Sequence, residues 1–302
     1  MYTDIKIEEI NLINLITEES LLLSEAGNSY VLDGRPDWGT VTADINYVGY
    51  VNQIGSQKTA TSLGTRDITI TGWVVASGIE DMKRKKKFLN SFINPFQDMR
   101  CEYEGYYIDF TPEKSVKYSK DYSKNNEVIC NFQVEGICGM PLFSNIKKTV
   151  ITQSPTYALP VFPLIIPEGK GAILGRAGDG SRRIINNTGA VDTWFELTIT
   201  CLEGTIQNPK VMLGEDSQTF IRVTTELSEG DTLFLSTEYG NEIVTVTKPD
   251  GSVTDLMAKV TRDSELFLLG QGENIVTVSD DSSNIENIDF KIEFSPLYME
   301  VQ

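Results

Sequence analysis

Thiols and carboxylates are the side chains of this sequence that could act in catalysis or bind a metal ion. The chain has 302 residues, with 43 aspartates and glutamates, four cysteines and no histidine. Histidine is the commonest general base and the commonest metal ligand, so its absence excludes histidine-based triads and histidine-containing zinc sites. No two carboxylates fall together on a recognisable element, as a glycosidase would need. We therefore predict no catalytic residue, no cofactor-binding residue and no metal ligand.

The cysteines are Cys101, Cys130, Cys138 and Cys201, and none belongs to a C-x-x-C pair. This spacing argues against a four-cysteine zinc site. Cys130 and Cys138 sit in apolar, strand-like segments, which is typical of reduced core residues. A disulfide framework suits short secreted chains, and the N-terminus has none of the features of a secretion signal. We expect synthesis in the cytoplasm.

Three further segments suggest ligand sites, and each has a plainer interpretation. Asp280 and Asp281 with Ser282–Asn284 offer oxygen ligands for calcium but lack EF-hand spacing, so we interpret them as an exposed polar turn. The glycines of 169–180 do not match a dinucleotide or phosphate-loop motif and are expected in loops or at strand edges. Trp194 could stack on a sugar, but alternation along a strand favours core or inter-sheet packing.

The net charge of −17 is spread unevenly. Residues 1–150 hold 20 acidic and 16 basic side chains, a net charge of −4, whereas residues 151–302 hold 23 and 10, a net charge of −13. Such a chain is a poor nucleic-acid binder, because phosphate binding needs clustered Lys and Arg. No apolar run approaches the roughly 20 residues of a membrane-spanning helix, so membrane insertion is not expected.

The length of the chain predicts two domains. Five prolines between Cys138 and Pro167 indicate an extended connection, since proline is excluded from central strands and helix interiors. Together with the charge asymmetry, they divide the chain into an N-terminal domain over 1–145, a linker over 146–160 and a C-terminal domain over 161–302.

Polar and apolar residues of the first half alternate with the period of two that is typical of strands. Strands are predicted at residues 30–32, 66–75 and 128–134, and a hairpin at 100–110 that turns at Glu104-Gly105.

One helix, over about residues 79–94, interrupts these strands. Ser77 is its predicted cap, acidic residues occupy its first turn, and it should end before Pro95. Its apolar stripe consists of Ile79, Met82, Leu89, Phe92 and Ile93. The basic run Lys83–Lys87 has no interleaved aromatic residues, so it predicts a solvated helix flank rather than a nucleic-acid surface. An acidic surface on a neighbouring subunit is an alternative partner for it.

The second half shows short strand-like segments, separated by turns about every 8–12 residues, which favours an antiparallel sandwich. The predicted strands are 193–201, 232–236, 242–247, 274–278 and 287–294, with a turn at Lys248–Gly251. The fold class is therefore mainly β, with two β-sandwich domains, the first carrying one α-helix.

The order of the short motifs along the whole chain is more specific than any single motif. In the first half they are Tyr30-Val31-Leu32-Asp33-Gly34, the Arg66-to-Trp73 strand, the basic helix ending at Asn94-Pro95, the Tyr103-to-Tyr107 hairpin, and the strand up to Pro141-Leu142-Phe143. In the second half they are Asn187-Thr188-Gly189, Gly204-to-Pro209, Gly230-to-Leu235, Ser264-to-Leu268 and Gly272-to-Val276. This ordered set resembles the distal tail protein (Dit) family of siphophages and related tail-like particles of Gram-positive hosts.

The resemblance implies a virion structural protein rather than an enzyme. It implies that the N-terminal domains form a homo-hexameric ring, between the tail tube protein and a tail-associated hub or lysin protein. It implies a galectin-like C-terminal domain at the periphery, near receptor-binding or baseplate proteins. The expected location is the tail tip of the virion, after synthesis and assembly in the host cytoplasm.

Two other functions remain open at this point. A carbohydrate-binding module acting on host cell-wall polysaccharide is suggested by the lectin-like second domain and Trp194. A hydrolase that uses carboxylates alone rests only on their number. The sequence leaves open the host, the kind of particle, the interface residues and whether the second domain binds sugar.

Overall fold

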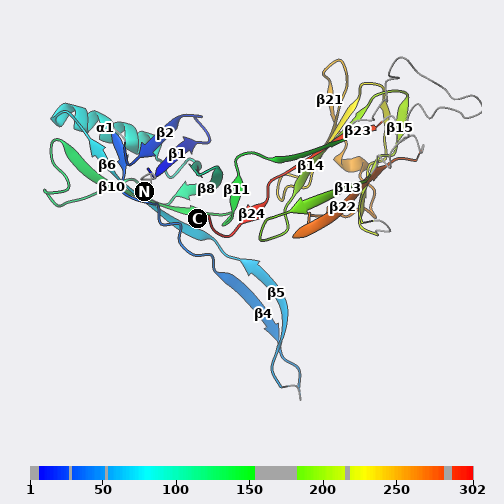
Figure 1. The fold of residues 1–302 in the computed structure, drawn as a ribbon, viewed down its shortest axis with the longest axis horizontal. Coiled ribbons are helices and arrows are strands. Elements are labelled where there is room, and N and C mark those ends of the chain that lie inside the picture. Colours follow the sequence, from blue (N-terminus) through cyan, green and yellow to red (C-terminus); the bar gives the residue numbers. More distant parts are fainter. Residues whose placement is uncertain are drawn as a thin grey trace, which may run out of the picture. The chain divides into compact units, whose positions relative to one another are not determined.

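The structure, a computed structural model, describes residues 7–26, 29–51, 54–153, 182–214, 218–281 and 288–301. The chain divides into two compact units (Figure 1). The first unit comprises Met1–Ile146 and Tyr298–Gln302, and the second comprises Lys147–Leu297.

This division departs from the predicted boundaries in two places. A strand of the second unit forms at Thr149–Gln153, within the segment assigned to the linker, because these residues pair with a strand close to the C-terminus. The last residues return to the first unit. The linker prolines 155–160, and the glycine segment 169–180, lie outside the described residues.

The first unit is built from one large sheet, a separate hairpin and a helix. Its elements are β1 (Glu9–Asn14), β2 (Ser20–Ser24), β3 (Tyr30–Leu32), β4 (Ala43–Val48), β5 (Gln57–Leu63), β6 (Arg66–Val75), α1 (Ile79–Phe92), β7 (Met99–Tyr103), β8 (Tyr106–Pro112), β9 (Lys117–Tyr118), β10 (Ile129–Cys138) and β11 (Phe143–Asn145), with β24 (Leu297–Tyr298). The predicted strands, helix and hairpin are all present. The hairpin turns where predicted, with φ of 49° at Glu104 and 88° at Gly105.

The large sheet closes on itself. Its strand order is β24-β11-β8-β7-β1-β2-β3-β6-β10-β9, and β8 also pairs with β10. The seven strands β8-β7-β1-β2-β3-β6-β10 therefore form a closed barrel around the core. The sequence had suggested a sandwich for this unit. Inward and outward residues alternate in both architectures, so only the long-range β8–β10 pairing distinguishes them.

The ladder between β6 and β10 shows why the alternation forms a core. Buried residues alternate along both strands, and ten residue pairs join them in register. Gly72 pairs with Phe132, and a Cβ on Gly72 would lie 2.6 Å from Cζ of that ring. A residue without a side chain is needed there, because the phenyl ring fills the space.

Helix α1 begins at Ile79 with Gly78 as its N-cap, so the prediction of Ser77 as the cap is wrong. The carboxylate of Asp81 in the first turn accepts hydrogen bonds from the N–H and the hydroxyl of Ser77, at 3.0 and 3.2 Å. Asp81 thus fixes Ser77 just before the helix, and Gly78 at the N-cap has no side chain that could cap the first turn. The helix ends at Phe92 as expected, and of the predicted stripe only Ile79 is exposed. In the described part of the chain, no helix is long and apolar enough to cross a membrane.

The C-terminal segment is held against the first unit by two arginines. The Arg66 guanidinium donates to the carbonyl of Met299, and that of Arg35 donates to the carbonyl of Val301. The ring of Tyr298 packs edge-on against Tyr106, with 5.4 Å between centroids. Arg66 is almost fully buried and lies over the ring of Phe143. The last residues are therefore part of the first unit's packing.

The second unit is a β-sandwich. Its elements are β12 (Thr149–Gln153), β13 (Arg182–Asn187), β14 (Phe195–Cys201), β15 (Thr205–Gln207), β16 (Lys210–Leu213), β17 (Phe220–Arg222), β18 (Glu226–Ser228), β19 (Thr232–Ser236), β20 (Ile243–Thr247), β21 (Val253–Asp255), the 3₁₀ turn η1 (Met257–Lys259), β22 (Gly272–Ser279) and β23 (Ile288–Phe294). One sheet has the order β12-β23-β14-β19-β20-β21, a second has β13-β22-β16-β17, and β15 pairs with β18. Side chains of both larger sheets share one core, which includes Phe195 and Phe290 from the first and Ile185 and Val276 from the second.

The predicted strands of this half are confirmed within a few residues at each end. The predicted turn is confirmed as well: the N–H of Gly251 donates to the carbonyl of Lys248 at 2.8 Å, and Gly251 has a φ of 83°.

Candidate interaction surfaces

The four thiols are buried and unbridged, which confirms their interpretation as reduced core residues. Burial raises the pKa of Cys101 far above its ordinary value, and raises that of Cys138 to about 12 although Arg66 lies nearby. A buried, protonated thiol is a poor nucleophile and a poor metal ligand. The cysteines therefore serve packing.

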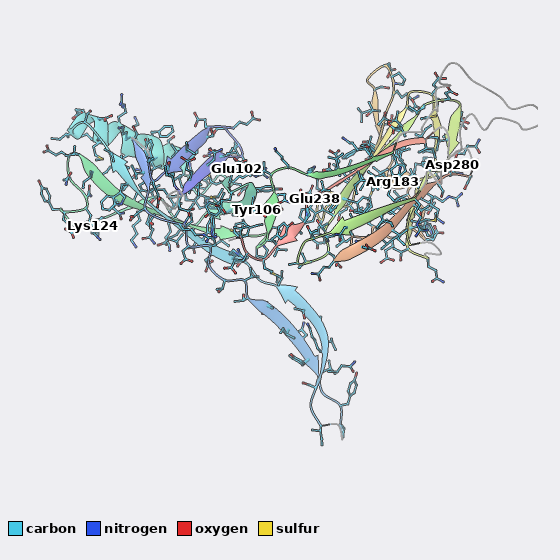
Figure 2. The ribbon with its side chains drawn as sticks, in the orientation of Figure 1. Glu102, Tyr106, Lys124, Arg183, Glu238 and Asp280 are labelled. Carbon is cyan, nitrogen blue, oxygen red and sulfur yellow. The ribbon has the colours of Figure 1, made fainter. Side chains whose placement is uncertain are left out.

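The carboxylates of the predicted 280–284 turn are held by protein donors. Asp281 accepts a hydrogen bond from the amide of Asn208 at 2.8 Å and pairs with the guanidinium of Arg222, and both lower its pKa. The backbone N–H of Gln207 donates to Asp280, labelled in Figure 2, at 3.5 Å. Ser282–Asn284 lie outside the described residues. Among the residues that are described, no three acidic or thiol side chains come together as a metal site.

Three members of the basic run Lys83–Lys87 of α1, namely Lys83, Arg84 and Lys85, form ion pairs with Glu80 and Asp81 on the same helix. The ammonium group of Lys85 donates to the carbonyl of Val75 at 2.7 Å, and that of Lys86 donates to Oδ1 of Asn125 at 2.8 Å. The exposed Lys83 pairs with Glu80 and the exposed Arg84 pairs with Asp81, in each case three residues earlier in the helix. This arrangement fits the interpretation as a solvated helix flank.

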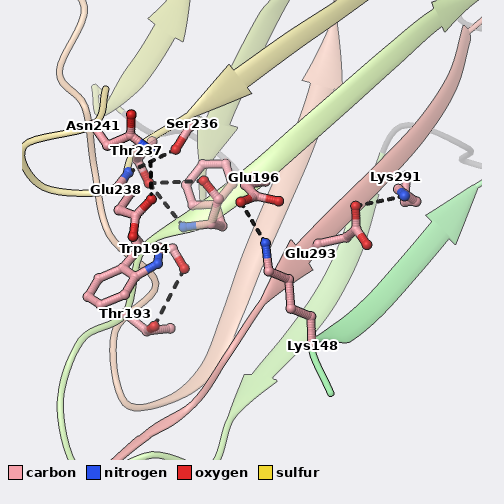
Figure 3. Close-up of polar contacts among 11 residues, drawn as sticks. Lys148, Thr193, Trp194, Glu196, Ser236, Thr237, Glu238, Asn241, Lys291 and Glu293 are labelled. Atoms are coloured by element: carbon pink, nitrogen blue, oxygen red, sulfur yellow. Dashed lines mark hydrogen bonds and ion pairs between the residues drawn. The ribbon is translucent and has the colours of Figure 1, made fainter. Parts of the chain in front are cut away.

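Trp194 lies just before β14 and is half-buried, so it stands at the margin of the second unit's core rather than within it. Figure 3 shows it beside the 237–241 loop, where the amide of Asn241 donates to the carboxylate of Glu238 at 3.0 Å. Tyr239 in this loop is 89% exposed. An aromatic ring, a carboxylate and an amide thus share one edge of the sandwich.

The outer face of the six-stranded sheet carries paired charges (Figure 3). Lys148 pairs with Glu196 at 2.6 Å, and Lys291 pairs with Glu293 at 2.7 Å. Exposed pairs of this kind contribute little to stability but cover the sheet with hydrated groups. This face offers charged side chains rather than a stacking platform.

An exposed apolar feature of the first unit is the β4–β5 hairpin with its connection, residues 43–63, which we call the arm. Figure 1 shows it extending away from the rest of the unit. Within the described part of the chain, its two strands pair only with each other, and every residue of both strands is exposed except the half-buried Leu63. The large exposed hydrophobic side chains of the arm are Ile45, Tyr47, Val48, Tyr50, Val51 and Ile54.

A second surface lies on the outward side of β2, β1 and β7. It is a groove of about 330 Å³, which we call the acidic groove. Its apolar walls are Ile7, Leu22 and Ile146, all at least two-fifths exposed. Its carboxylates are Glu8, Glu9, Glu102 and Glu104, of which Glu102 is labelled in Figure 2.

Internal hydrogen bonds hold three of these carboxylates, and the hydroxyl of Ser24 donates to Glu9 at 2.8 Å. The hydroxyl of Tyr103 donates to Glu8 at 2.6 Å, and the amide of Asn11 donates to Glu102 at 2.9 Å. The groove is thus an ordered surface with a single sign of charge.

Neither surface was predicted from the sequence. Alternation at Ala43, Ile45 and Tyr47 was the available signal for the arm, but such a pattern does not say that both faces stay in solvent. The groove combines residues about 80 positions apart, which become neighbours only because β1 pairs with both β2 and β7.

Two family models match the chain. The phage tail protein RIFT-related domain matches residues 16–126, and the C-terminal domain of the siphovirus-type tail component matches residues 188–298. Each match falls on one of the two units, apart from the final matched residue. No curated protein matches the chain.

Solved structures match over nearly the whole length. The crystal structure of SPP1 Dit, described as a paradigm of the hub adsorption apparatus in phages that infect Gram-positive hosts, has a TM-score of 0.65 at 11% identity, and the match covers 95% of this chain and 98% of that one. A chain of the phage P2 baseplate in its activated conformation with calcium has a TM-score of 0.50 at 12% identity, covering 96% and 98%. The strontium form gives the same score and identity, covering 95% and 98%. At these identities the likeness shows the fold.

The two matched models together span more than two thirds of the chain and define it as a structural component of a phage tail. The chain belongs to the siphovirus-type distal tail (Dit) proteins, which confirms the resemblance seen in its motifs.

Proposed function

We propose that this chain forms a homo-hexameric ring at the distal end of the tail, where it joins the tail tube to the tail tip and organises the host-adsorption proteins. The observation that carries the proposal is a fold shared over both units with SPP1 Dit, itself described as part of a hub adsorption apparatus. The likeness to chains of the P2 baseplate supports the same role.

The proposed partners lie on different faces of the ring. The tail tube protein binds one side and a tail-associated hub or lysin protein binds the other, with receptor-binding or baseplate proteins around them. The second unit is a galectin-like sandwich at the periphery. The protein is made and assembled in the host cytoplasm and ends at the tail tip of the virion.

The distribution of charge supports this arrangement. Residues 1–150 carry a net charge of −4, which allows copies of the first unit to pack closely. Residues 151–302 carry −13, so repulsion favours second units that are kept apart. The interface between neighbours in a closed ring is heterologous, so each copy presents two different surfaces.

We also propose that the protein acts by assembly and not by catalysis. The thiols are buried, and the adjacent Asp280 and Asp281 accept hydrogen bonds from protein donors. Among the described residues, the carboxyls whose pKa values are shifted all have lowered pKa values, because they accept hydrogen bonds, so none of them is suited to act as a general acid at neutral pH.

The test is the assembly state of the purified full chain. Light scattering should give the mass of a hexamer, and negative-stain images should show rings. A monomer at high concentration that also fails to form rings with its tail tube and hub proteins would contradict the proposal.

A second candidate function is binding of host cell-wall polysaccharide by the second unit. Tyr239 is exposed in the 237–241 loop, and Figure 3 shows this loop beside Trp194. This favours the function, because aromatic faces stack on sugars. The full chain should then bind purified cell-wall polysaccharide, and Tyr239→Ala should weaken binding at least tenfold. Equal binding by the wild type and the variant, or none by the wild type, would argue against this function.

A further inference from the structure

The arm has the properties of a segment that packs against another protein surface. A two-stranded hairpin is only marginally stable in water when nothing covers it. The arm nevertheless leaves both of its strand edges unpaired, and Val51 and Ile54 near its tip are almost completely exposed. An exposed, ordered hairpin with apolar side chains is typical of an interaction surface.

The register of the arm separates its two faces. Ala43 pairs with Leu63, Ile45 with Thr61, and Tyr47 with Lys58, and partners across an antiparallel ladder point to the same side. A bulge at Asn46/Tyr47 places Lys58 on this side. One face of the arm is therefore apolar and carries Lys58 as its only charge.

The opposite face of the arm is mostly polar. Its paired residues are Asp44 with Ser62, Asn46 with Ala60, and Val48 with Gln57. The two faces therefore differ in polarity, and the apolar face is the one that carries Ile45 and Tyr47.

The acidic groove complements that face in shape and in charge. It offers Ile7, Leu22 and Ile146 to the apolar side chains and four carboxylates to the Lys58 ammonium. Among the described residues, Lys58 has no hydrogen bond or ion pair of its own. The Lys58 ammonium and the carboxylates of the groove have opposite charges, so they attract each other and orient the approaching chains.

The arm cannot fill the groove of its own chain. Figure 1 shows it running away from β1 and β2, whose outer side forms the groove. Outside Asp44 and Lys58 the segment 43–63 has no charged residue, so it approaches a second acidic copy without net repulsion. The occupant that fits the groove is therefore the arm of a second copy.

We infer that the arm of each copy docks through its Ile45–Tyr47 face into the acidic groove of the next copy. Each copy then gives one arm and receives one, which is the head-to-tail pattern that closes into a ring. The inference rests on the proposed ring and names the surfaces that hold it together.

Cross-linking tests the docking directly, because the native thiols are all buried and give no background. Lys58→Cys and Glu104→Cys are made in separate full-length chains, mixed, and treated with a bis-maleimide. We expect a cross-linked dimer only in the mixture. The matched control replaces Lys58→Cys by Lys117→Cys, another exposed lysine of the first unit, and should give no dimer.

Charge exchange provides a second measurement. Lys58→Glu should weaken assembly at least tenfold in a light-scattering dilution series, and Glu104→Lys in the same chain should restore it. Asp44→Asn, on the opposite face of the arm, should leave assembly unchanged. Because Asp44, Lys58 and Glu104 are all exposed, circular dichroism should be the same for all these variants.

The outcomes separate the two proposals. If the wild type never assembles, the proposed ring itself is contradicted. If the wild type forms rings but the mixture yields no more dimer than the control, or Lys58→Glu assembles normally, the docking is overturned while the ring stands. A cross-link to the arm that appears only when a different tail protein is added also overturns it.

Discussion

The side-chain amide of Asn187 donates to the backbone carbonyl of Leu269 at 3.0 Å, and so joins two segments 82 positions apart. The same amide donates to the carbonyl of Val191 at 3.0 Å, and its oxygen accepts from the N–H of Gly189 at 2.9 Å. One buried residue thus satisfies three backbone groups where β13 ends. This gives a physical reason for the Asn187-Thr188-Gly189 motif.

Asn187→Ala should destabilise the second unit. It leaves three buried backbone groups without their partner, and we expect a loss of about 3 kcal/mol in the free energy of unfolding. Urea unfolding followed by Trp194 fluorescence measures this loss. Asn241→Ala, at an exposed position, is the control and should change little. Equal midpoints for the two variants would show that the buried amide contributes nothing.

Gly189→Ala should also destabilise the second unit, for a steric reason. A Cβ at Gly189 would lie 2.7 Å from the backbone nitrogen of Leu297 and 2.8 Å from its carbonyl oxygen, so the backbone would have to move. Forced overpacking of this kind costs about 1–3 kcal/mol. In Gly270→Ala the nearest atom would lie 3.6 Å away, an ordinary contact, so this control should keep its thermal midpoint. A normal midpoint for Gly189→Ala would refute the steric explanation.

Ending the chain after Leu297 should destabilise the first unit. The truncation removes the carbonyl groups that accept from Arg66 and Arg35, and leaves the buried Arg66 with fewer partners. We expect a loss of roughly 3 kcal/mol, seen as faster hydrogen exchange in β6. Met299→Ala keeps the backbone carbonyl and should exchange like the wild type. Unchanged protection of β6 in the truncated chain would contradict this role for the C-terminal segment.

Local patterns in the sequence were sufficient to predict most strands, the helix and one turn of this fold. Alternation located the strands, because residues on one side of a strand face the core in both units. Acidic residues and Pro95 bounded the helix, and Glu104-Gly105 marked a turn that needs positive φ. Each of these signals depends on residues close together in the chain.

Contacts between distant residues could not be predicted in this way. The β8–β10 pairing closes the barrel, and the bond from Arg66 to Met299 spans 233 positions. Neither leaves a local pattern. The acidic groove and the arm were also not predicted. A surface consists of the residues that remain exposed after folding, whereas periodicity identifies only the residues that face the core.

The four thiols should be inert in the native protein. Burial raises the pKa values of Cys101, Cys138 and Cys201, and all four cysteines are shielded from solvent. Ellman's reagent should therefore report no fast-reacting thiol at pH 8, and four after unfolding in guanidinium chloride. Any fast-reacting thiol in the native protein would contradict the packing, and would also add background to the cross-linking experiment.

The first unit should lose stability at alkaline pH. Burial, assisted by Asp81, raises the pKa of Tyr30 to about 12, and burial with a hydrogen bond to Glu8 raises that of Tyr103 to about 12. Unfolded tyrosine ionises near pH 10, so this stabilisation is complete below pH 10 and is lost as the pH rises towards 12. Native protein at pH 11 should show fewer phenolates by absorbance at 295 nm than unfolded protein, and Tyr30→Phe should flatten the loss of stability above pH 10. If all twelve tyrosines titrated together near pH 10 while the protein stayed folded, the buried positions of these rings would be wrong.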